Sequence, residues 1–467
     1  MQRAIEDYVR SLDLEAYLVG GAVRDELLGK ESKDADFLVP GVDADGLRER
    51  LAPHGKVEDL VVAGRLVGMR LYPRDPEVRA LAPKGIEFAP PRRERSTGPG
   101  RHDFEIVVDP EAAVEDDMAR RDFTVNAIAR RLADDSLVDP FHGRRDLEHG
   151  VLRTVSEHSF AEDPLRLVRG LRLVSQLGLE PDETTLRQMH DEAGSVKLIS
   201  GERVGGGLAA DGMGELSKLL LGREPARALR LARDTGVLVA LLPEFEPAIG
   251  FDQESRYHDL TLDEHTFAVV QAAADAGRSL AVRLAALLHD LGKPVVAWRG
   301  NDGRLHFYGR SKGDPNHEQV GAELAGRALR RLRYPNDLRS RVVRIVRHHM
   351  LDIGKGDALR ARKLLAKHGE GLAFDLVDHK EADLRGKPDS ERELAELARF
   401  REVLGRERSS PHRLRDLAVN GADLIELGYR PGPDLGRALD RLLHEVVGDP
   451  SLNRRDWLLT RARELLA

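Results

Sequence analysis

The sequence predicts an α+β fold in which a mixed α/β head is followed by a mainly helical body. Between residues 16 and 41, two strand-like runs flank a glycine pair and a short helix-like run. After about Phe160, apolar residues recur at spacings of three and four, as on one face of a helix. Aromatic residues make up only 4% of the chain, which favours helices packed through aliphatic side chains.

The head is expected to contain further strands and one loop. Apolar runs at 61–72, 84–89 and 103–109 predict strands. Between the last two, the segment 89–102 is rich in Pro, Gly and Arg, which predicts a mobile loop without regular pairing.

The length of the chain predicts several domains. Its 467 residues exceed the roughly 150 of a typical domain, so several hydrophobic cores are expected. Pro- and Gly-containing stretches and changes of pattern predict a head at 1–155, a helical neck at 156–250, a histidine-rich domain at 251–405 and a helical tail at 406–467.

Composition excludes several kinds of site. The chain has no cysteine, which excludes disulfides, thiolate zinc sites and a cysteine nucleophile, so any metal must be held by His, Asp or Glu. No run reaches the ~18 apolar residues of a membrane span, and the first residues lack the apolar core of a signal peptide. A cytoplasmic protein without a membrane partner is therefore expected.

The charge of the chain argues both against and for RNA binding. The formal net charge is −7, which argues against broad electrostatic attraction to RNA. Two local stretches, 328–349 and 359–369, are nevertheless basic. Each is compatible with an RNA contact or with a solvated helix face.

Two aspartates predict a magnesium site in the head. Asp34 and Asp36 are separated by one residue on a predicted strand, so their carboxylates point to the same face. Carboxylates together with substrate phosphates suit Mg²⁺, and two ions ~3.5–4 Å apart can activate a hydroxyl and stabilise leaving pyrophosphate. Such a pair alone also describes a solvated strand end. Upstream, Gly20 and Gly21 allow backbone N–H groups to approach a triphosphate, and Arg24 can add a charged contact.

The string LVGGAVRDELLGKESKDADFLV (18–39) closely resembles the head of class II tRNA nucleotidyltransferases and bacterial poly(A) polymerases. This resemblance implies a polymerase-β-like head in which Asp34 and Asp36 are catalytic and hold Mg²⁺, while Gly20, Gly21 and Arg24 bind the nucleotide. Glu87, on the predicted strand GIEFA, is a further candidate carboxylate for the metal site.

Two later strings resemble nucleotide-binding motifs of the same family. MARRDFTVNAIA (118–129) resembles the second motif, and FAEDPLRLVRGLRLVSQLGL (160–179) resembles the template motif that reads the incoming base with protein side chains. Asp163 and Arg166 lie three residues apart, which predicts that they share one helix face and offer an acceptor and donors to a base edge. The resemblance implies nucleotide contacts for Arg120, Arg121, Asp122, Asn126, Asp163 and Arg166.

Two strings depart from the family pattern. VDPFHGRRDLEHGVLRTV (138–155) resembles the hinge between head and neck, but His142 stands where the family often has a smaller residue. Glu202-Arg203-Val204 resembles the start of the fifth motif, but GGGLAADGMG (205–214) follows where a helix is expected. Glycine clusters break helices, so we expect a loop or an interrupted helix that bears on nucleotide specificity.

Histidines predict a second metal centre. Seven of the 17 histidines lie between His258 and His349. LAALLHDLGKP (284–294) resembles the HD phosphohydrolase superfamily, which implies a divalent transition metal or Mg²⁺ on His265, His289, Asp290 and Asp383. His317 and one of His348 or His349 are the auxiliary candidates. Such a metal makes bound water acidic enough to attack a phosphate ester. A helical domain that keeps its histidines for packing is the alternative.

The segment 417–449 resembles the tail of bacterial tRNA nucleotidyltransferases that carry an HD domain. The whole pattern predicts template-independent addition of CCA to the 3′ end of tRNA from CTP and ATP, with an additional HD phosphatase or 2′,3′-cyclic phosphodiesterase. A poly(A) polymerase, or an enzyme adding only CC or A, is the nearest alternative because it shares the motifs. An HD phosphohydrolase with an inactive head and a non-catalytic RNA-binding protein are more distant alternatives. The sequence leaves the oligomeric state open.

Overall fold

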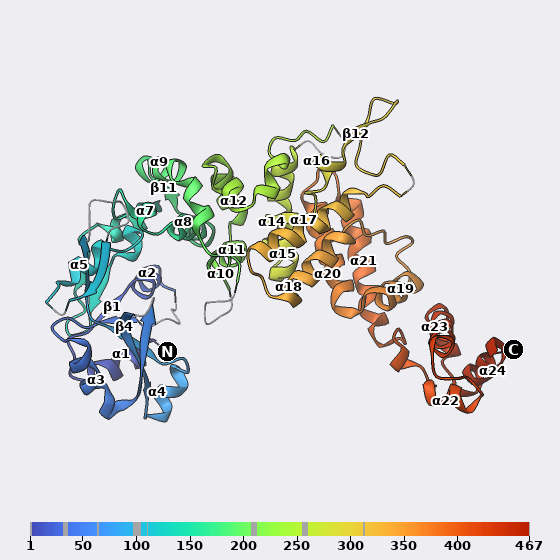
Figure 1. Cartoon of the computed structure of the whole chain (residues 1–467), viewed down its shortest axis with the longest axis horizontal. Helices are drawn as coiled ribbons and strands as arrows, with labels where there is room; N and C mark the ends of the chain where they lie inside the picture. Colours follow the sequence, from blue (N-terminus) through green and yellow to red (C-terminus); the bar gives the residue numbers. More distant parts are fainter. Residues whose placement is uncertain are drawn as a thin grey trace. The chain divides into compact units, whose positions relative to one another are not determined.

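The structure is a computed structural model, and it describes residues 2–30, 36–62, 65–96, 104–109, 111–206, 213–254, 260–311 and 313–466. The chain forms two compact units (Figure 1). Unit 1 comprises residues 1–204 and 227–241, and unit 2 comprises residues 205–226 and 242–467. The boundaries of the four expected domains stay predictions.

A seven-stranded mixed sheet forms the centre of the head in unit 1, which confirms the α+β expectation. Its order is β3-β4-β5-β2-β1-β8-β9, with β2 and β5 parallel and all other neighbours antiparallel. The strands are β1 (Tyr17–Val19), β2 (Asp36–Leu38), β3 (Gly55–Val62), β4 (Arg65–Pro73), β5 (Ile86–Ala89), β8 (Ala129–Arg131) and β9 (Leu137–Val138).

The larger apolar core of the head packs on one face of the sheet. Phe37 and Phe88 are fully buried and stack with ring centroids 5.6 Å apart. They belong to one core with Met69 and Leu71 of β4 and with apolar residues of the head helices. Because side chains alternate along a strand, the neighbours Asp36 and Glu87 lie on the opposite face. The helices on this core are α1 (Gln2–Arg10), α2 (Gly21–Leu27), α3 (Ala44–Leu51) and α4 (Pro76–Leu81).

Two expectations about the head strands need correction. The run 61–72 is not one strand, because it contains the end of β3 and most of β4, which pair as a hairpin. The segment 89–102 is not wholly a loop, because β6 (Arg92–Ser96) pairs with β7 (Phe104–Val108). Pro90 and Pro91 precede β6, so every residue of that strand keeps the backbone N–H that pairing requires. Residues 97–103 lie outside the described part of the chain.

Helices make up the rest of unit 1. The short strands β10 (Val151–Leu152) and β11 (Glu180–Pro181) form a parallel pair beside them. The helices are α5 (Val114–Ala119), α6 (Gly143–Glu148), α7 (Ser159–Glu162), α8 (Leu165–Leu177), α9 (Glu183–Asp191), α10 (Gly201–Val204), α12 (Pro225–Asp234) and α13 (Val237–Leu241), with a 3₁₀ turn η2 (Thr124–Asn126). The first two residues of α12 belong to unit 2.

Unit 2 is mainly helical, as the apolar spacing predicts. Its one described hairpin joins β12 (Trp298–Arg299) to β13 (Leu305–His306). The helices are α11 (Glu215–Leu220), α14 (Leu262–Asp275), α15 (Leu280–Leu288), α16 (Lys293–Val296), α17 (His317–Arg331), α18 (Asn336–Arg347), α19 (Ala358–His368), α20 (Glu370–Arg385), α21 (Glu391–Arg406), α22 (Gly421–Glu426), α23 (Pro433–Gly448) and α24 (Arg455–Leu466).

Helix α15 lies at the centre of unit 2. All its residues from Ala281 to Leu288 are buried, as expected of a helix that is apolar nearly all round. Its one charged residue, Arg283, is buried as well, and its guanidinium donates to the backbone carbonyls of Leu220, at 2.7 Å, and Arg278, at 2.9 Å. The residues that follow α15 are therefore attached to a buried helix. A separate core joins α22, α23 and α24 in the tail.

The glycine-rich run 205–214 interrupts a helical region, as expected. Helix α10 ends at Val204 and α11 begins at Glu215. Residues 207–212 lie outside the described part of the chain. Among the described helices, none is long and apolar enough to cross a membrane.

We expect Gly292→Ala to destabilise unit 2. A Cβ at this position would lie 2.1 Å from the carbonyl oxygen of His317 and 2.7 Å from the backbone nitrogen of Gly321. Backbone must move to relieve such contacts, at a cost of about 1–3 kcal/mol. Thermal unfolding followed by circular dichroism measures the loss. The matched control is Gly371→Ala on α20, where a Cβ meets nothing within 4 Å, and equal melting temperatures for the two variants would contradict the packing described.

Candidate functional site

Two acidic residues lie side by side on the face of the head sheet opposite Phe37 and Phe88. Asp36 of β2 is the direct register partner of Glu87 of β5 in the parallel pair. Glu87 also forms an ion pair with Arg70, its partner on β4. Asp34, the other aspartate of the predicted pair, lies outside the described residues. The sheet therefore brings together Asp36 and Glu87, which are far apart in sequence.

A pocket of about 340 Å³ opens over these carboxylates. Its lining includes Asp36 and Glu87, together with Arg120 and Arg121 from the segment after α5. Neither Asp122 nor Asn126 is among its lining residues. The pocket thus combines acidic groups that suit a divalent cation with guanidinium groups that suit phosphate.

The arginines of the pocket are arranged around a buried carboxylate. Asp117 of α5 is 3% exposed. Its oxygens lie 3.2 Å from Nη2 of Arg121, 3.5 Å from Nη1 of Arg120 and 3.9 Å from Nε of Arg92. Asp117 therefore gathers three guanidinium groups beside the pocket.

Gly20 is required where the chain passes under Arg121. Its φ of 72° lies in the left-handed region, and a Cβ there would come within 2.6 Å of Nη1 of Arg121. Gly21 is the first residue of α2. The glycine pair therefore lets the backbone after β1 approach the pocket wall.

A chain of hydrogen bonds joins three of the predicted motifs. Arg24 of α2 donates from Nη1 to Oδ1 of Asn126, at 2.7 Å. Asn126 donates from Nδ2 to Oδ1 of Asp122, at 2.9 Å, and Arg169 of α8 donates from Nε to Oδ2 of Asp122, at 2.7 Å. Asp122 and Asn126 are buried. Their hydrogen bonds join α2 to α8.

Asp122 is ionised despite its burial. Burial opposes ionisation, but the charge of Arg169 and the hydrogen bonds from Asn126, Arg169 and the backbone of Phe123 outweigh it and lower the pKa of Asp122 to about 2. The carboxylate is therefore a fixed negative charge at neutral pH.

The template-motif residues do not share a helix face as expected. Asp163 has extended backbone between α7 and α8, because Pro164 follows it, whereas Arg166 lies in α8. Arg203 of α10 donates to both oxygens of Asp163, at 2.8 and 3.3 Å. Arg166 donates to the backbone oxygen of Arg120, at 2.7 Å, and pairs with Glu162, at 2.7 Å. The motif is thus joined to the pocket segment and to the predicted fifth motif.

The hinge residues hold a tight turn. His142 has a φ of 58°, a left-handed conformation in which His is better tolerated than most residues. A Cβ on Gly143 would lie 1.9 Å from the carbonyl oxygen of Thr124, so this position requires glycine. Asp139 accepts the backbone N–H of Gly143 at 2.7 Å, and buried Asp146 accepts the hydroxyl of Thr124 at 2.7 Å.

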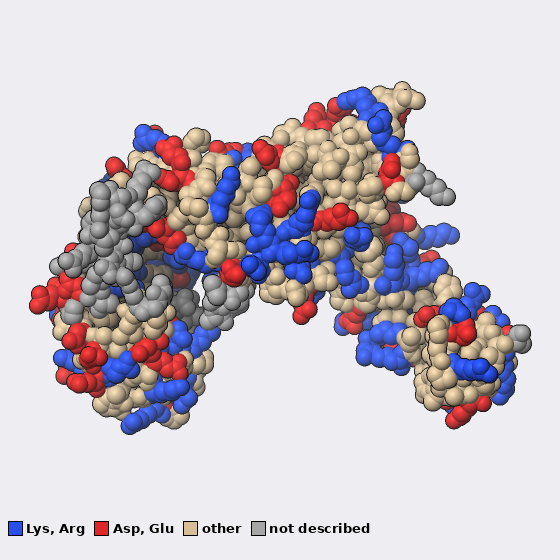
Figure 2. All heavy atoms as spheres, in the orientation of Figure 1, with Lys and Arg blue, Asp and Glu red and all other residues tan. Residues whose placement is uncertain are grey.

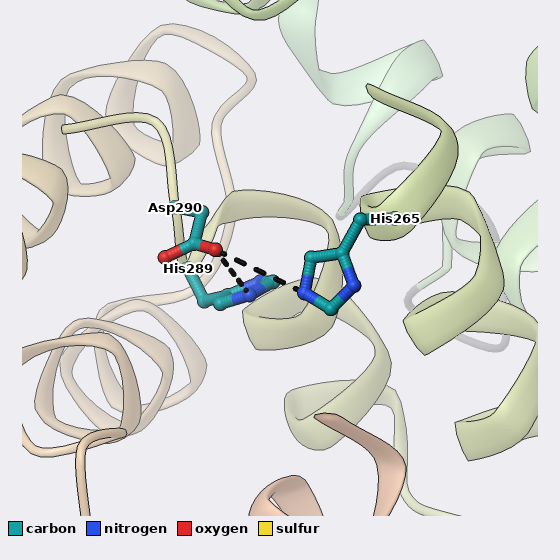
Figure 3. A group of neighbouring side chains, drawn as sticks. All are labelled: His265, His289 and Asp290. Atoms are coloured by element: carbon teal, nitrogen blue, oxygen red, sulfur yellow. Dashed lines mark ion pairs between the residues drawn. The ribbon is translucent and has the colours of Figure 1, made fainter. Parts of the chain in front are cut away.

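Unit 2 brings the predicted HD residues together around Asp290. His289 and Asp290 directly follow α15, and His265 lies on α14 (Figure 3). Asp383 lies on α20. One oxygen of Asp290 lies 3.0 Å from Nε2 of His289 and 4.0 Å from Nε2 of His265, and Asp383 lies 3.3 Å from the latter nitrogen. All four side chains are buried.

The other oxygen of Asp290 faces a second pair of histidines. It lies 3.5 Å from Nε2 of His349 and 3.8 Å from Nε2 of His317. In the described part of the chain, His265, His289 and Asp290 form one group that could hold a metal ion, and Asp290, His317 and His349 form another. Asp290 is common to both, as in sites where a carboxylate bridges two ions.

The imidazole rings are oriented to offer Nε2. The Nδ1 atoms of these four histidines lie 2.7–3.1 Å from backbone carbonyl oxygens, which fixes the proton on Nδ1 and leaves a lone pair on Nε2. Nε2 of His317 and Oδ1 of Asp290 are buried without a hydrogen-bond partner among the described residues. These groups fit a divalent metal.

The protonation states in this cluster suit metal binding, because two of the imidazoles are neutral and the shared aspartate is ionised. Burial lowers the pKa of His289, and it lowers that of His317 to about 4, so both rings are neutral at pH 7. Burial opposes ionisation of Asp290, but neighbouring groups that include the ammonium of Lys293 outweigh it and hold the pKa of that carboxyl well below its usual range. Lys293 lies 2.7 Å from Asp290, and Lys387 lies 2.7 Å from Asp383.

Of the two neighbouring candidates, His349 joins the cluster and His348 does not. The His348 ring lies 4.7 Å, between centroids, from that of His368 on α19. His379 of α20 is a buried neighbour that the sequence prediction omits, with its ring 5.1 Å from that of His289. It precedes Asp383 by four residues, one helical turn, and this spacing is the signal that could have identified it.

Other partners were also missed. Arg169 and Arg203 each complete an ion pair with a predicted site residue, Asp122 and Asp163 respectively. Arg169 follows Arg166 by three residues, so helical spacing could have indicated it. Arg203 was part of a recognised motif, but the sequence gives no distance between residues 163 and 203.

Three family models match the chain. The Poly A polymerase head domain matches residues 16–153, and the HD domain matches residues 262–395. A model described as the probable RNA and SrmB-binding site of polymerase A matches residues 178–249.

Curated relatives match over most of their length. The multifunctional CCA protein of Methylobacillus flagellatus is 33% identical over 440 residues, which cover 89% of this chain and 98% of that protein. The protein of the same name from Alkalilimnicola ehrlichii is 36% identical over 408 residues, which cover 83% of this chain and 88% of the relative.

Solved structures share the fold. The CCA-adding enzyme of Bacillus stearothermophilus, crystallised with CTP, has a TM-score of 0.67 and 24% identity, and the match covers 99% of this chain and 96% of that one. The Thermotoga maritima CCA-adding enzyme complexed with tRNA has a TM-score of 0.56 and 20% identity, and the match covers 100% and 94%.

We expect Asp122→Asn to destabilise unit 1 in a pH-dependent way. The pKa of about 2 lies below the ordinary 3.8, so the stabilisation by ionised Asp122 is present above pH 3.8 and is lost as the pH falls toward 2. The difference corresponds to about 2 kcal/mol. Denaturant unfolding at pH 6, 4 and 3 should show the gap between wild type and variant narrowing below pH 4. Asp45→Asn, exposed on α3, is the control, and a gap that stays constant with pH would refute the ionised state.

Proposed function

Because this chain belongs to the family of multifunctional CCA proteins, we propose that it adds CCA to the 3′ end of tRNA, using CTP and ATP in a Mg²⁺-dependent nucleotidyl transfer. The observation that carries the proposal is the pairing of Asp36 with Glu87 in a pocket that Arg120 and Arg121 also line. Carboxylates and guanidiniums in one pocket suit a metal-bound triphosphate.

The residues of the head site have two roles: some contact the substrate or its metal ion, and others hold the contacting residues in place. Asp34 and Asp36 would hold Mg²⁺, which activates the attacking RNA 3′-hydroxyl and neutralises charge on the phosphates. Glu87 is the candidate for a third carboxylate. Arg120 and Arg121 bind oxygens of the triphosphate, so that the 3′-oxygen attacks the α-phosphate in line and pyrophosphate leaves.

A second set of residues holds the elements around the pocket in place. We assign this role to Arg24, Asn126, Asp122 and Arg169, whose hydrogen bonds run from α2 to α8. Asp163 and Arg166 are proposed to read the base edge of CTP or ATP, since they offer an acceptor and donors. The ion pair from Arg203 and the contact of Arg166 with the Arg120 carbonyl hold them near the pocket segment.

We also propose a phosphohydrolase activity for the HD cluster in unit 2, acting on phosphate monoesters or 2′,3′-cyclic phosphates at RNA ends. A divalent transition metal or Mg²⁺ on His265, His289, Asp290 and Asp383 would supply an acidic bound water. Two His and Asp groups that share Asp290 support this proposal. A cytoplasmic location stays a prediction.

We expect Asp34→Ala/Asp36→Ala to abolish nucleotide addition. Loss of metal-held charge costs several kcal/mol, and each ~1.4 kcal/mol is tenfold, so the rate should fall by about 10³-fold or more. The assay follows labelled CTP and ATP joining tRNA that ends before CCA. Asp45→Ala/Glu49→Ala removes two exposed carboxylates from α3 and should retain wild-type rates. A double variant of 34 and 36 that adds nucleotides at the control's rate would exclude this metal site.

We expect neighbouring histidines of unit 2 to differ in metal binding. His349→Ala should remove an ion from the site that includes His317, whereas His348→Ala should leave the metal content unchanged, because His348 lies against His368. Elemental analysis after dialysis against Mn²⁺ or Ni²⁺ measures the content directly, and hydrolysis of a 2′,3′-cyclic nucleotide gives a second readout. Equal losses in the two variants would argue against the second group as a metal site.

A further inference from the structure

Two helices of unit 2 form a groove lined with arginines. It lies between α17 and α18 and has a volume of about 570 Å³. Small residues such as Ala322, Gly326 and Ser340 line it and leave space between the helices. The arginines are Arg327 and Arg330 from α17, and Arg339, Arg344 and Arg347 from α18.

Positive charge predominates in this groove. Of the described residues that line it, Glu323 alone is acidic. Among the described residues, no carboxylate lies within 4 Å of the guanidinium of Arg327, Arg330, Arg339 or Arg347. By contrast, the neighbours Arg331 and Arg341, which do not line the groove, pair with Glu244 and Asp375. Unpaired guanidiniums in a protein of net charge −7 indicate an anionic ligand.

The groove continues onto a second basic helix. Nη2 of Arg344 donates to the backbone oxygen of His368 at the end of α19, at 3.3 Å, and the rings of His348 and His368 lie 4.7 Å apart. Helix α19 carries Lys363 and Lys367. The two basic stretches of the sequence, 328–349 and 359–369, therefore meet. Figure 2 shows Lys and Arg side chains gathered where Figure 1 labels α17 and α19.

We propose that this arginine groove binds the phosphate backbone of the RNA substrate. Guanidinium groups bind phosphate through paired hydrogen bonds, and groups on both walls can hold successive phosphates of one strand. The groove lies outside residues 178–249, which match the RNA-binding family model, so it is an additional RNA contact. The identity of the RNA as tRNA rests on the proposed function.

The test compares two triple variants with equal loss of charge. Arg327→Ala/Arg330→Ala/Arg347→Ala removes groove arginines. The control, Arg392→Ala/Arg415→Ala/Arg437→Ala, removes arginines whose side chains are 71–87% exposed elsewhere in unit 2. The probe is tRNA lacking CCA, and its dissociation constant is measured by filter binding between 50 and 200 mM salt, with circular dichroism to verify folding.

The groove variant should bind tRNA more weakly than wild type, and its slope of log K against log salt should be shallower by about 2–3. Each lost phosphate contact removes roughly 0.7–0.9 from that slope. The control should match wild type. Arg327→Lys/Arg330→Lys/Arg347→Lys keeps the charges and should keep most of the slope. A groove variant that binds tRNA with the control's affinity and slope would overturn the inference. A groove that binds an acidic protein instead of RNA would give this result.

Failure of this inference and failure of the proposed function give different results. If wild type adds CCA and the groove variant binds like the control, the groove inference is wrong and the activity stands. If wild type adds no nucleotide, but the groove variant binds tRNA more weakly than wild type and with a smaller salt dependence, RNA binding by the groove stands and the proposed activity is wrong.

Discussion

The buried carboxylate of Asp122 is the contact on which the head site depends. It accepts hydrogen bonds from Arg169 of α8 and from Asn126 in the turn after α5. Asn126 in turn accepts a hydrogen bond from Arg24 of α2. Removing one partner from a buried charged pair leaves an uncompensated charge, which is far more costly than losing a surface pair. Three segments that are distant in sequence are thereby held in one arrangement, and the two arginines that precede Asp122 line one pocket with the carboxylates of the sheet.

Unit 2 uses the same physical device for a different chemistry. Asp290 emerges from the end of the buried helix α15, and its two oxygens face two sets of imidazole nitrogens. Backbone carbonyls fix the rings, so the orientation of the ligands is set before any ion binds. In both units a buried aspartate collects groups from several elements, but in the head it supports the pocket wall, whereas in unit 2 it is itself the candidate ligand.

Local pattern and motif order predicted much of the fold and of the candidate sites, and the failures have physical causes. The mixed head sheet and helical remainder follow from spacing, and the histidine series meets in one cluster because each member lies on or beside a helix packed around α15. The local sequence does not reveal strand pairing, so it predicts a loop where β6 lies, and it offers Glu87 as a candidate ligand without placing it beside Asp36. The partner Arg203 is not predicted either, because a tertiary ion pair leaves no spacing signal unless both groups lie on one helix. Lys387 follows Asp383 by four residues, so helical spacing could have indicated it.

The central claim is that the head adds a defined CCA end to tRNA. The most direct measurement incubates the purified protein and Mg²⁺ with tRNA ending before CCA, supplies CTP, ATP or both, and sequences the 3′ ends. We expect addition of C-C-A with both nucleotides, followed by termination, and addition of C alone with CTP. A long A tail, addition limited to C or to A when both nucleotides are present, or no addition at all would contradict it.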